Sequence, residues 1–260
     1  MHNNFMRDEF VDEYSEPKPL VFRLKNDEIL YETDGLVAVN KPAGLLTTPD
    51  RFASALPCLQ EVLQEKYSDI FVVHRIDKDT SGVILFAKNE SAHRQLSLQF
   101  EERNIKKTYL ALVNGILSDK EGIIDAPIGE DKKGKAKIDH QEGKSSQTSY
   151  KVIEEFRKLS LVEASPVTGR QHQIRVHFQS IGHPLAVDPY YGTRKALMLS
   201  EFKKKYRQNS SHGERPLLGR LSLHALRITF SDPVTGKDVT LEASLPKDFR
   251  ATLNQLRKYY

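Results

Sequence analysis

The segment HRIDKDTSGVILFAK occupies residues 74–88 and joins a polar loop to an apolar run. The polar part contains His74, Arg75 and Asp77, directly after a short apolar stretch. Gly82 permits a tight backbone geometry, and the run VILFA that follows it is typical of a buried strand. A carboxylate at such a junction can be held rigidly at the edge of a cleft. We therefore expect Asp77 to lie in a functional site.

Two simpler interpretations of this segment remain open from its residue types alone. An Arg–Asp pair can do no more than fix the turn. Alternatively, Asp77 and Asp79 resemble the two carboxylates of a glycosidase. That chemistry needs carboxyl groups about 5–9 Å apart, on opposite sides of the scissile bond. Because residues two apart usually face the same way, a hydrolase of nucleosides or glycans is the weaker hypothesis; it requires a second carboxylate near Asp77.

The apolar pattern on both sides of this segment predicts more strands than helices. Besides a hairpin around Asp34-Gly35, strands are expected at 71–73, 83–87, 108–113, 123–128, 148–153, 159–164, 221–230 and 239–243. Helices are expected at 57–66, 91–103, 171–182 and 249–260. The Lys- and Gly-rich stretch 129–146 is expected to form a loop or mobile hairpin. The predicted fold class is α/β of the α+β type, with a mixed, largely antiparallel sheet and flanking helices and loops.

The bulk composition is that of a globular protein with a sizeable core. The chain has 260 residues, of which 38% are hydrophobic and 28% charged. No apolar stretch approaches the roughly 20 residues of a membrane span, and the first residues lack the apolar centre of a secretory signal. Cys58 is the single cysteine, so no internal disulfide can form. We expect a cytoplasmic protein with no membrane contact.

The net charge of +4 is unevenly distributed along the chain. Residues 1–34 hold four Lys/Arg and nine Asp/Glu, whereas residues 194–220 hold eight and two. We expect an acidic arm at 1–27 and one catalytic domain at 28–260. The basic run suits contact with a polyanion. A solvated surface insertion explains it equally well.

Two further motifs resemble ligand sites but lack essential parts. GEDKKGKA at 129–136 nearly matches a phosphate-binding loop, yet Ala136 replaces the hydroxyl that would hold magnesium. His172 and His177 are five residues apart, so they do not share a helix face as zinc ligands four apart would. We expect neither a metal nor a cofactor, and we expect one or both histidines to donate hydrogen bonds within a packed polar cluster.

HRIDKDTSG closely resembles the signature H-R-[LI]-D-x-x-T-S-G of the RluA family of RNA pseudouridine synthases. Other family motifs follow in the same order: NKPAGLLTTP, KKTYLALVNG, SLVEASPVTGRQHQIRVHFQSIGHPLAVDPYYG and LSLHALRITFSDPVTGK. The resemblance spans about residues 29–248 and implies the pseudouridine synthase catalytic fold. Val187 stands before Asp188 where the family commonly has glycine, and residues 194–215 resemble an insertion. The S4 RNA-binding domain of some relatives is not expected here.

The resemblance implies an isomerase that converts a specific uridine to pseudouridine in structured RNA. Asp77 then attacks the sugar or removes a sugar proton. Arg175 is implied as the cation that keeps this buried carboxylate ionised, as an arginine fork on it. Tyr109 is implied to stack on the uracil and to help the C5 proton leave. The alternative is a catalytically inactive RNA-binding protein of the same fold.

The implied partner is a ribosomal or transfer RNA with the uridine in a stem-loop, and no obligate protein partner is expected. A uridine must leave its stack to react, at a cost of a few kcal/mol. Arg75 is implied to fill the space that the base vacates. Residues expected to contact RNA are His74, Arg75, Lys41, Arg170, Lys203, Lys204 and Lys205. Contacts to phosphates supply affinity that depends on salt and little on sequence.

Overall fold

The computed structural model describes residues 22, 24–25, 28–50, 56–207 and 213–260 of the chain. Its strands are β1 (Ile29–Glu32), β2 (Leu36–Lys41), β3 (Phe71–Val72), β4 (Ser81–Ala87), β5 (Lys106–Asn114), β6 (Glu121–Asp125), β7 (Ile128–Glu130), β8 (Ala136–Ile138), β9 (Gln147–Phe156), β10 (Leu159–Pro166), β11 (Leu223–Ser231) and β12 (Asp238–Glu242). Its helices are α1 (Leu59–Gln64), α2 (Glu90–Glu101), α3 (Gln173–Ser180) and α4 (Lys247–Tyr259), with a short 3-10 turn, η2 (Leu199–Glu201). Most of the predicted acidic arm lies outside the described residues.

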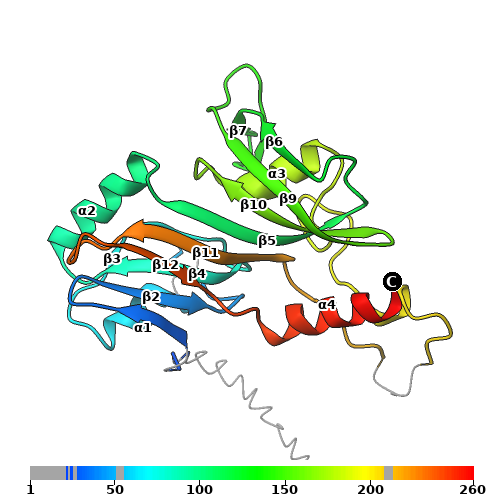
Figure 1. The fold of residues 1–260 in the computed structure, drawn as a ribbon, viewed down its shortest axis with the longest axis horizontal. Coiled ribbons are helices and arrows are strands. Elements are labelled where there is room, and N and C mark those ends of the chain that lie inside the picture. The colour runs from blue at the N-terminus through cyan, green and yellow to red at the C-terminus, as the bar shows by residue number, and fades with distance from the viewer. Residues whose placement is uncertain (1–21, 23, 26–27, 51–55, 208–212) are drawn as a thin grey trace, which may run out of the picture.

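Within the described residues, ten strands form one sheet in the order β1-β2-β4-β11-β5-β10-β9-β6, with β3 beside β4 and β12 beside β11 (Figure 1). The pairs are antiparallel except for β4 and β11, which run parallel. The predicted fold class is therefore confirmed. The strand expected at 123–128 is divided into β6 and β7, since Pro127 has no N–H to continue a ladder. The hairpin expected within 129–146 forms a separate pair, β7 and β8.

Strand β5 is covered on both faces, which explains its continuous apolar run. Leu110 and Leu112 pack with residues of α4, whereas Ala111 and Val113 pack with residues of α3. Alternate residues of a strand point to opposite faces, so two helices bury four consecutive residues. Helix α3 and the β7–β8 hairpin accordingly lie on one side of the sheet and α4 on the other (Figure 1). Tyr109 faces the α3 side.

The parallel junction between β4 and β11 lies directly after the 74–80 segment. Ser81 pairs with His224 and Gly82 with Ala225. Gly82 has a φ of +118°, and a Cβ atom built on it would lie 2.1 Å from the carbonyl oxygen of Ala225. Ser81 Oγ also contacts His224 Nδ1 at 2.9 Å. The two halves of the sheet therefore meet where the segment containing Asp77 enters β4.

The basic insertion is anchored in the core beneath α4. Leu197 forms an isolated bridge with Leu218, and both are fully buried. Phe202 joins them in the apolar cluster that includes Phe249 and Leu253 of α4. Leu197 and Phe202, two residues of the insertion, thus pack as core, which differs from a wholly solvated insertion. Separately, none of the described helices has the length and apolar character needed to cross a membrane.

The close approach at Gly82 generates a stability prediction. Gly82→Ala should lower the free energy of unfolding by at least about 3 kcal/mol, because the new methyl group overlaps a carbonyl oxygen and the φ disfavours a side chain. Gly134→Ala is the matched control: Gly134 has a φ of +75° but open space around its Cβ position. It should cost about 1–2 kcal/mol. Urea unfolding measures both; equal losses would contradict the steric account.

Candidate active site

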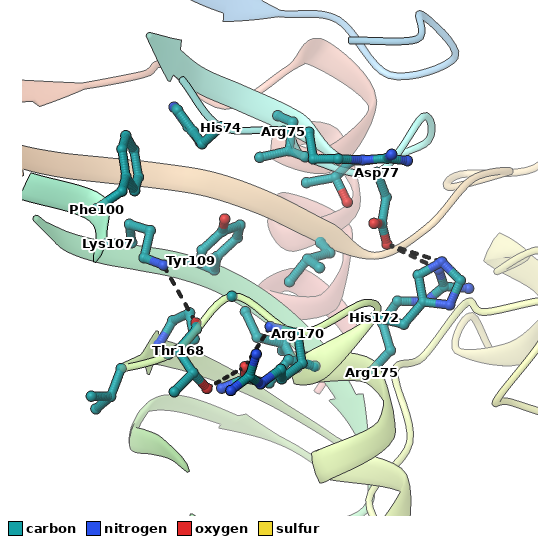
Figure 2. A pocket seen from close by; sticks show the side chains of 18 of the residues that line it. His74, Arg75, Asp77, Phe100, Lys107, Tyr109, Thr168, Arg170, His172 and Arg175 are labelled. Carbon is teal, nitrogen blue, oxygen red and sulfur yellow. Dashed lines mark hydrogen bonds and ion pairs between the residues drawn. The ribbon is translucent and has the colours of Figure 1, made fainter. Parts of the chain in front are cut away.

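A cavity of about 480 Å³ opens beside the sheet junction (Figure 2). This volume lies within the roughly 300–1,000 Å³ of small-molecule sites. Its walls are the segment 73–80, the end of α2, the first half of β5, and the turn and start of α3 at 166–175. Asp77, Tyr109 and Arg175 lie far apart in the sequence, and all three line this cavity.

Asp77 is held by one of its two carboxylate oxygens. Arg175 Nη1 donates to Asp77 Oδ2 at 2.9 Å, and His172 Nε2 lies 3.8 Å from the same oxygen. The Asp77 side chain keeps 29% of its surface exposed toward the cavity. Among the described residues, no hydrogen bond occupies Asp77 Oδ1. One oxygen is therefore fixed by a cation while the other is free to meet a ligand.

The guanidinium of Arg175 forms its bidentate hydrogen bond, the fork, with Asp188. The prediction that this fork binds Asp77 is therefore wrong. Arg175 Nε donates to Asp188 Oδ2 at 2.8 Å and Nη2 to Asp188 Oδ1 at 2.9 Å. Asp188 also accepts the backbone N–H groups of Tyr190 and Tyr191. Burial raises the pKa of the Asp188 carboxyl, but the Arg175 hydrogen bonds and charge outweigh it and leave that pKa below its ordinary value. Asp188 thus holds the guanidinium that reaches Asp77.

Asp188 and His172 are site residues that the sequence reasoning missed. His172 precedes α3 with a φ of +52°, a conformation that side chains rarely adopt. This aims the ring between Asp77 and Tyr191, whose hydroxyl lies 3.0 Å from His172 Nδ1. Burial lowers the pKa of His172, although the Asp77 charge opposes the shift. The position of His172 only three residues before Arg175 in the chain was the available signal.

Tyr109 faces the cavity from β5 as a neutral phenol. Burial, with a smaller contribution from the Asp77 charge, raises the pKa of Tyr109 well above its ordinary value. Its ring is half-buried, and it packs beside apolar residues that also face the α3 side of the sheet. The geometry therefore places a ring and a protonated hydroxyl near Asp77.

Lys41 is fully buried, so the prediction that it contacts RNA is wrong. Its ammonium donates to the carbonyl oxygens of Pro42 (3.0 Å), Leu45 (2.6 Å) and Lys78 (2.9 Å). Burial lowers the pKa of Lys41 to about 7, against the opposing charges of nearby aspartates. Lys41 ties the loop after β2 to the residue that follows Asp77, which is a structural task.

The same loop makes a second link to this segment. Thr47 Oγ1 donates to the carbonyl oxygen of Ile76 at 3.0 Å, and Gly44 N donates to that of Lys78 at 2.9 Å. The backbone on both sides of Asp77 is thereby held. The NKPAGLLTTP motif contributes to the site through these contacts.

His74 supports the cavity wall and offers no positive charge. Its Nε2 accepts the backbone N–H of Leu85 at 3.0 Å, and its ring packs on Phe100. Burial, with a smaller contribution from Lys107, lowers the pKa of His74 to about 3. A phosphate contact through a charged His74 is thus disfavoured, which corrects its assignment to RNA binding.

Two arginines predicted to contact RNA lie at the cavity rim. Arg75 is exposed, and Arg170 is half-buried with Nε 3.4 Å from the carbonyl oxygen of Ser145. Both line the cavity. Their guanidinium groups are therefore accessible to an anionic ligand entering the site, so their assignment stays a prediction.

The three consecutive lysines of the basic insertion lie away from this cavity, and none of them lines it. Lys203 is half-buried with its ammonium 6.0 Å from the ring centre of Tyr259, whereas Lys204 and Lys205 are exposed. Contact of this segment with RNA stays a prediction and concerns a surface separate from the cavity.

The motifs that resembled ligand sites have ordinary structural partners. His177 is buried with Ser146, Thr148 and the carbonyl oxygen of Ala126 around its ring, as the expected polar cluster requires. In the 129–136 segment, Asp131 Oδ1 accepts two backbone N–H groups of its own turn. Across the described residues, no group of three or more His, Cys, Asp or Glu is arranged to hold a metal.

Comparison with known proteins gives one consistent result. A family model described as RNA pseudouridylate synthase matches residues 35–180. The chain is 36% identical over 260 residues to an uncharacterized RNA pseudouridine synthase of Bacillus subtilis, covering 96% of this chain and 77% of that protein. It is 38% identical over 213 residues to the dual-specificity RNA pseudouridine synthase RluA of Vibrio parahaemolyticus, covering 79% and 78%.

Two further proteins are similar to this chain, one in sequence and one in fold. The ribosomal large subunit pseudouridine synthase C of Vibrio vulnificus is 38% identical over 234 residues, covering 89% of this chain and 70% of that protein. Among solved structures, human RNA pseudouridylate synthase domain containing 4 matches with a TM-score of 0.67 and 27% identity. That match covers 89% of this chain and 93% of the human one.

The fork on Asp188 generates a pH-dependent stability prediction. Asp188→Asn should lower the free energy of unfolding at pH 7 by about 3–5 kcal/mol, because it removes one partner of a buried ion pair. The Asp188 pKa in the folded protein lies below the ordinary 3.8. Its contribution is therefore complete above that value and is lost as the pH falls through the lower, folded pKa. The difference in the free energy of unfolding between wild type and variant should therefore be smaller at pH 3 than at pH 7.

Urea unfolding at pH 7, 5 and 3 measures this gap. Asp238→Asn is the matched control, since Asp238 is an exposed carboxylate on β12; it should change stability by less than about 0.5 kcal/mol. A loss at Asp188 no larger than that of the control, or a gap that widens toward pH 3, contradicts the role given to the fork.

Proposed function

This chain belongs to the RluA family of RNA pseudouridine synthases, and from that membership we propose that it isomerises a uridine of structured ribosomal or transfer RNA with Asp77 as its catalyst. One observation carries the assignment: the partly exposed side chain of Asp77 lines a cavity while Arg175 holds its Oδ2 at 2.9 Å. The relative named for the ribosomal large subunit makes ribosomal RNA the first substrate to test.

The reaction rearranges bonds within one nucleotide and needs only one carboxylate. The C1′–N1 bond breaks, the uracil turns, and C5 bonds to C1′. The hydrogen on C5 then leaves as a proton and N1 gains a proton, so the product is an isomer of the starting nucleotide. Asp77 either bonds to the sugar or takes a sugar proton, and both roles require it to be ionised. The Arg175 guanidinium stabilises that ionised form, and Asp188 keeps the guanidinium aimed at it.

We assign Tyr109 to stacking on the uracil ring. Its raised pKa keeps the phenol protonated at neutral pH, so it is suited to stacking and to donating a hydrogen bond rather than to accepting the C5 proton. Aromatic side chains stack on unpaired bases in many RNA complexes. This revises the expectation that Tyr109 helps the C5 proton leave.

The rim arginines are assigned to the RNA around the target. Arg75 is exposed beside Asp77, so it is placed to fill the gap that a flipped uridine leaves. Arg170 stands on the opposite wall and suits a phosphate next to the target. The exposed lysines of the basic insertion lie on a surface separate from the cavity and are assigned to more distant phosphates.

An inactive RNA-binding protein of the same fold is the alternative, and it predicts RNA affinity without turnover. The position of Asp77 favours the enzyme, because this carboxylate lines the cavity with one oxygen available to a ligand, whereas both oxygens of Asp188 bind Arg175. A hydrolase is disfavoured because Glu101, at the end of α2, is the only other carboxylate among the described residues that line the cavity.

Replacing the catalytic carboxylate should separate turnover from binding. Asp77→Asn should lower pseudouridine formation at least about 10⁴-fold, the scale of losses for groups that act on the reacting atoms, while RNA affinity changes less than threefold. Nucleoside mass spectrometry and filter binding, on RNA from cells that lack this gene, measure the two. Asp79→Asn, an exposed neighbour, is the matched control and should keep full activity. Near-normal turnover by Asp77→Asn would sink the assignment.

Removing two exposed charges of the insertion should weaken the salt dependence of binding. The Lys204→Gln, Lys205→Gln double variant should reduce the slope of log affinity against log salt by about 1.5, since each phosphate contact contributes roughly 0.7–0.9. Exposed Lys237 and Lys247, both changed to Gln, form the control pair and should leave the slope unchanged. An unaltered slope in the first variant would show that these two exposed lysines do not contact phosphates.

A further inference from the structure

Lys107 places a positive charge in the cavity of the candidate active site. The catalytic mechanism proposed above does not use this charge. Lys107 and Tyr109 are two residues apart on β5, so their side chains project to the same face of the strand. Both line the cavity. The neighbouring Lys106 points to the opposite face and is exposed.

The surroundings of Lys107 leave its hydrogen-bonding capacity mostly unused. In the described part of the chain, no carboxylate lies within 4.0 Å of its nitrogen, and its one hydrogen bond is a long one, 3.4 Å, to the carbonyl oxygen of Thr168. Lys107 is half-buried in the cavity wall, and this burial lowers the pKa of its ammonium below the ordinary value. A lysine head can donate three hydrogen bonds, and a desolvated donor without acceptors is costly. An acceptor from a ligand is therefore expected here.

The carbonyl group of Thr168 is held firmly beside this donor. Thr168 Oγ1 donates to Gln173 Oε1 at 2.6 Å. Gln173 Nε2 in turn donates to the carbonyl oxygen of Gln147 at 2.9 Å and to Thr148 Oγ1 at 3.1 Å. These bonds anchor the 166–172 turn to β9. A donor and a fixed carbonyl acceptor thus lie side by side in the cavity wall.

The position of this pair points to a base and not to a phosphate. Figure 2 shows Tyr109 between Asp77 and Lys107, so a base that lies on the tyrosine with its sugar at Asp77 extends toward the lysine. Phe100 and His74 form the wall around the lysine. Aromatic and apolar walls suit a flipped base, whereas the exposed rim arginines suit phosphates.

We infer that Lys107 and the Thr168 carbonyl read the edge of the target uracil, with the lysine donating to O4 and the carbonyl accepting from N3–H. This assignment rests on the proposed function. Uracil presents an acceptor beside a donor on that edge. Cytosine presents an amino donor in place of O4 and an unprotonated N3, so the same pair rejects it. The pair therefore selects uracil by hydrogen bonds, whereas stacking on Tyr109 does not distinguish uracil from cytosine.

The test uses two pools of in vitro transcripts that cover the ribosomal and transfer RNAs of the source organism. One pool is made with UTP and the other with 4-thio-UTP, in which sulfur replaces O4 and is a weaker acceptor. Wild type, Lys107→Met and the matched control Lys106→Met are compared by nucleoside mass spectrometry of the isomerised product. Filter binding at several salt concentrations gives the salt slope of each variant.

Lys107→Met should lose about 10- to 100-fold in turnover on the UTP pool, the scale of a hydrogen bond from a charged group. On the 4-thiouridine pool, its rate should come within about threefold of wild type, because the acceptor is already weakened there. Its salt slope should equal that of wild type, and Lys106→Met should match wild type throughout. Lys107→Gln keeps a donor of reduced strength and should fall between wild type and Lys107→Met.

Three results would overturn the inference while the proposed function stands. The first is turnover by Lys107→Met within threefold of Lys106→Met on the UTP pool. The second is an equal loss on both pools, which marks a structural role. The third is a salt slope lower by about one, which marks a phosphate contact. Absence of product from wild type on every transcript is a different outcome: it overturns the proposed function and this inference together.

Discussion

The site depends on one buried guanidinium that two carboxylates share. Arg175 gives two of its nitrogens to Asp188 and a third to Asp77, and its side chain is only 5% exposed. Burying a charge without partners is expensive, so the Asp188 fork is what permits this arginine to stand in the cavity wall. Asp77 then pairs with a guanidinium whose orientation is already fixed by Asp188. The arrangement leaves one oxygen of Asp77 for the substrate.

The sheet supplies the stiffness that this arrangement needs. The parallel pairing of β4 with β11 brings the two halves of the sheet together immediately after Asp77. The buried Lys41 ammonium holds the backbone on one side of Asp77, and the Thr47 hydroxyl holds it on the other. A catalytic group needs to be held within a fraction of an ångström of its working position. These buried contacts hold the backbone of the loop in place and make no use of the Asp77 carboxylate.

Local patterns in the sequence predicted much of the fold and part of the site. Continuous apolar runs predicted β4 and β5, and the motif resemblance brought Asp77, Tyr109 and Arg175 together, as the structure also does. The errors concern partners that only the tertiary structure brings close. Lys41 looked like a surface cation, but three carbonyl oxygens from two loops surround it. The fork of Arg175 goes to Asp188, which lies on a separate turn 13 residues away.

We propose that the chain rearranges a uridine without releasing its base. The most direct measurement incubates the protein with RNA that carries tritium at uridine C5 and follows two products, tritiated water and free uracil. Isomerisation releases the C5 hydrogen and keeps the base in the RNA chain, so we expect tritiated water without free uracil. Free uracil that retains its tritium would show hydrolysis of the glycosidic bond and would contradict the account.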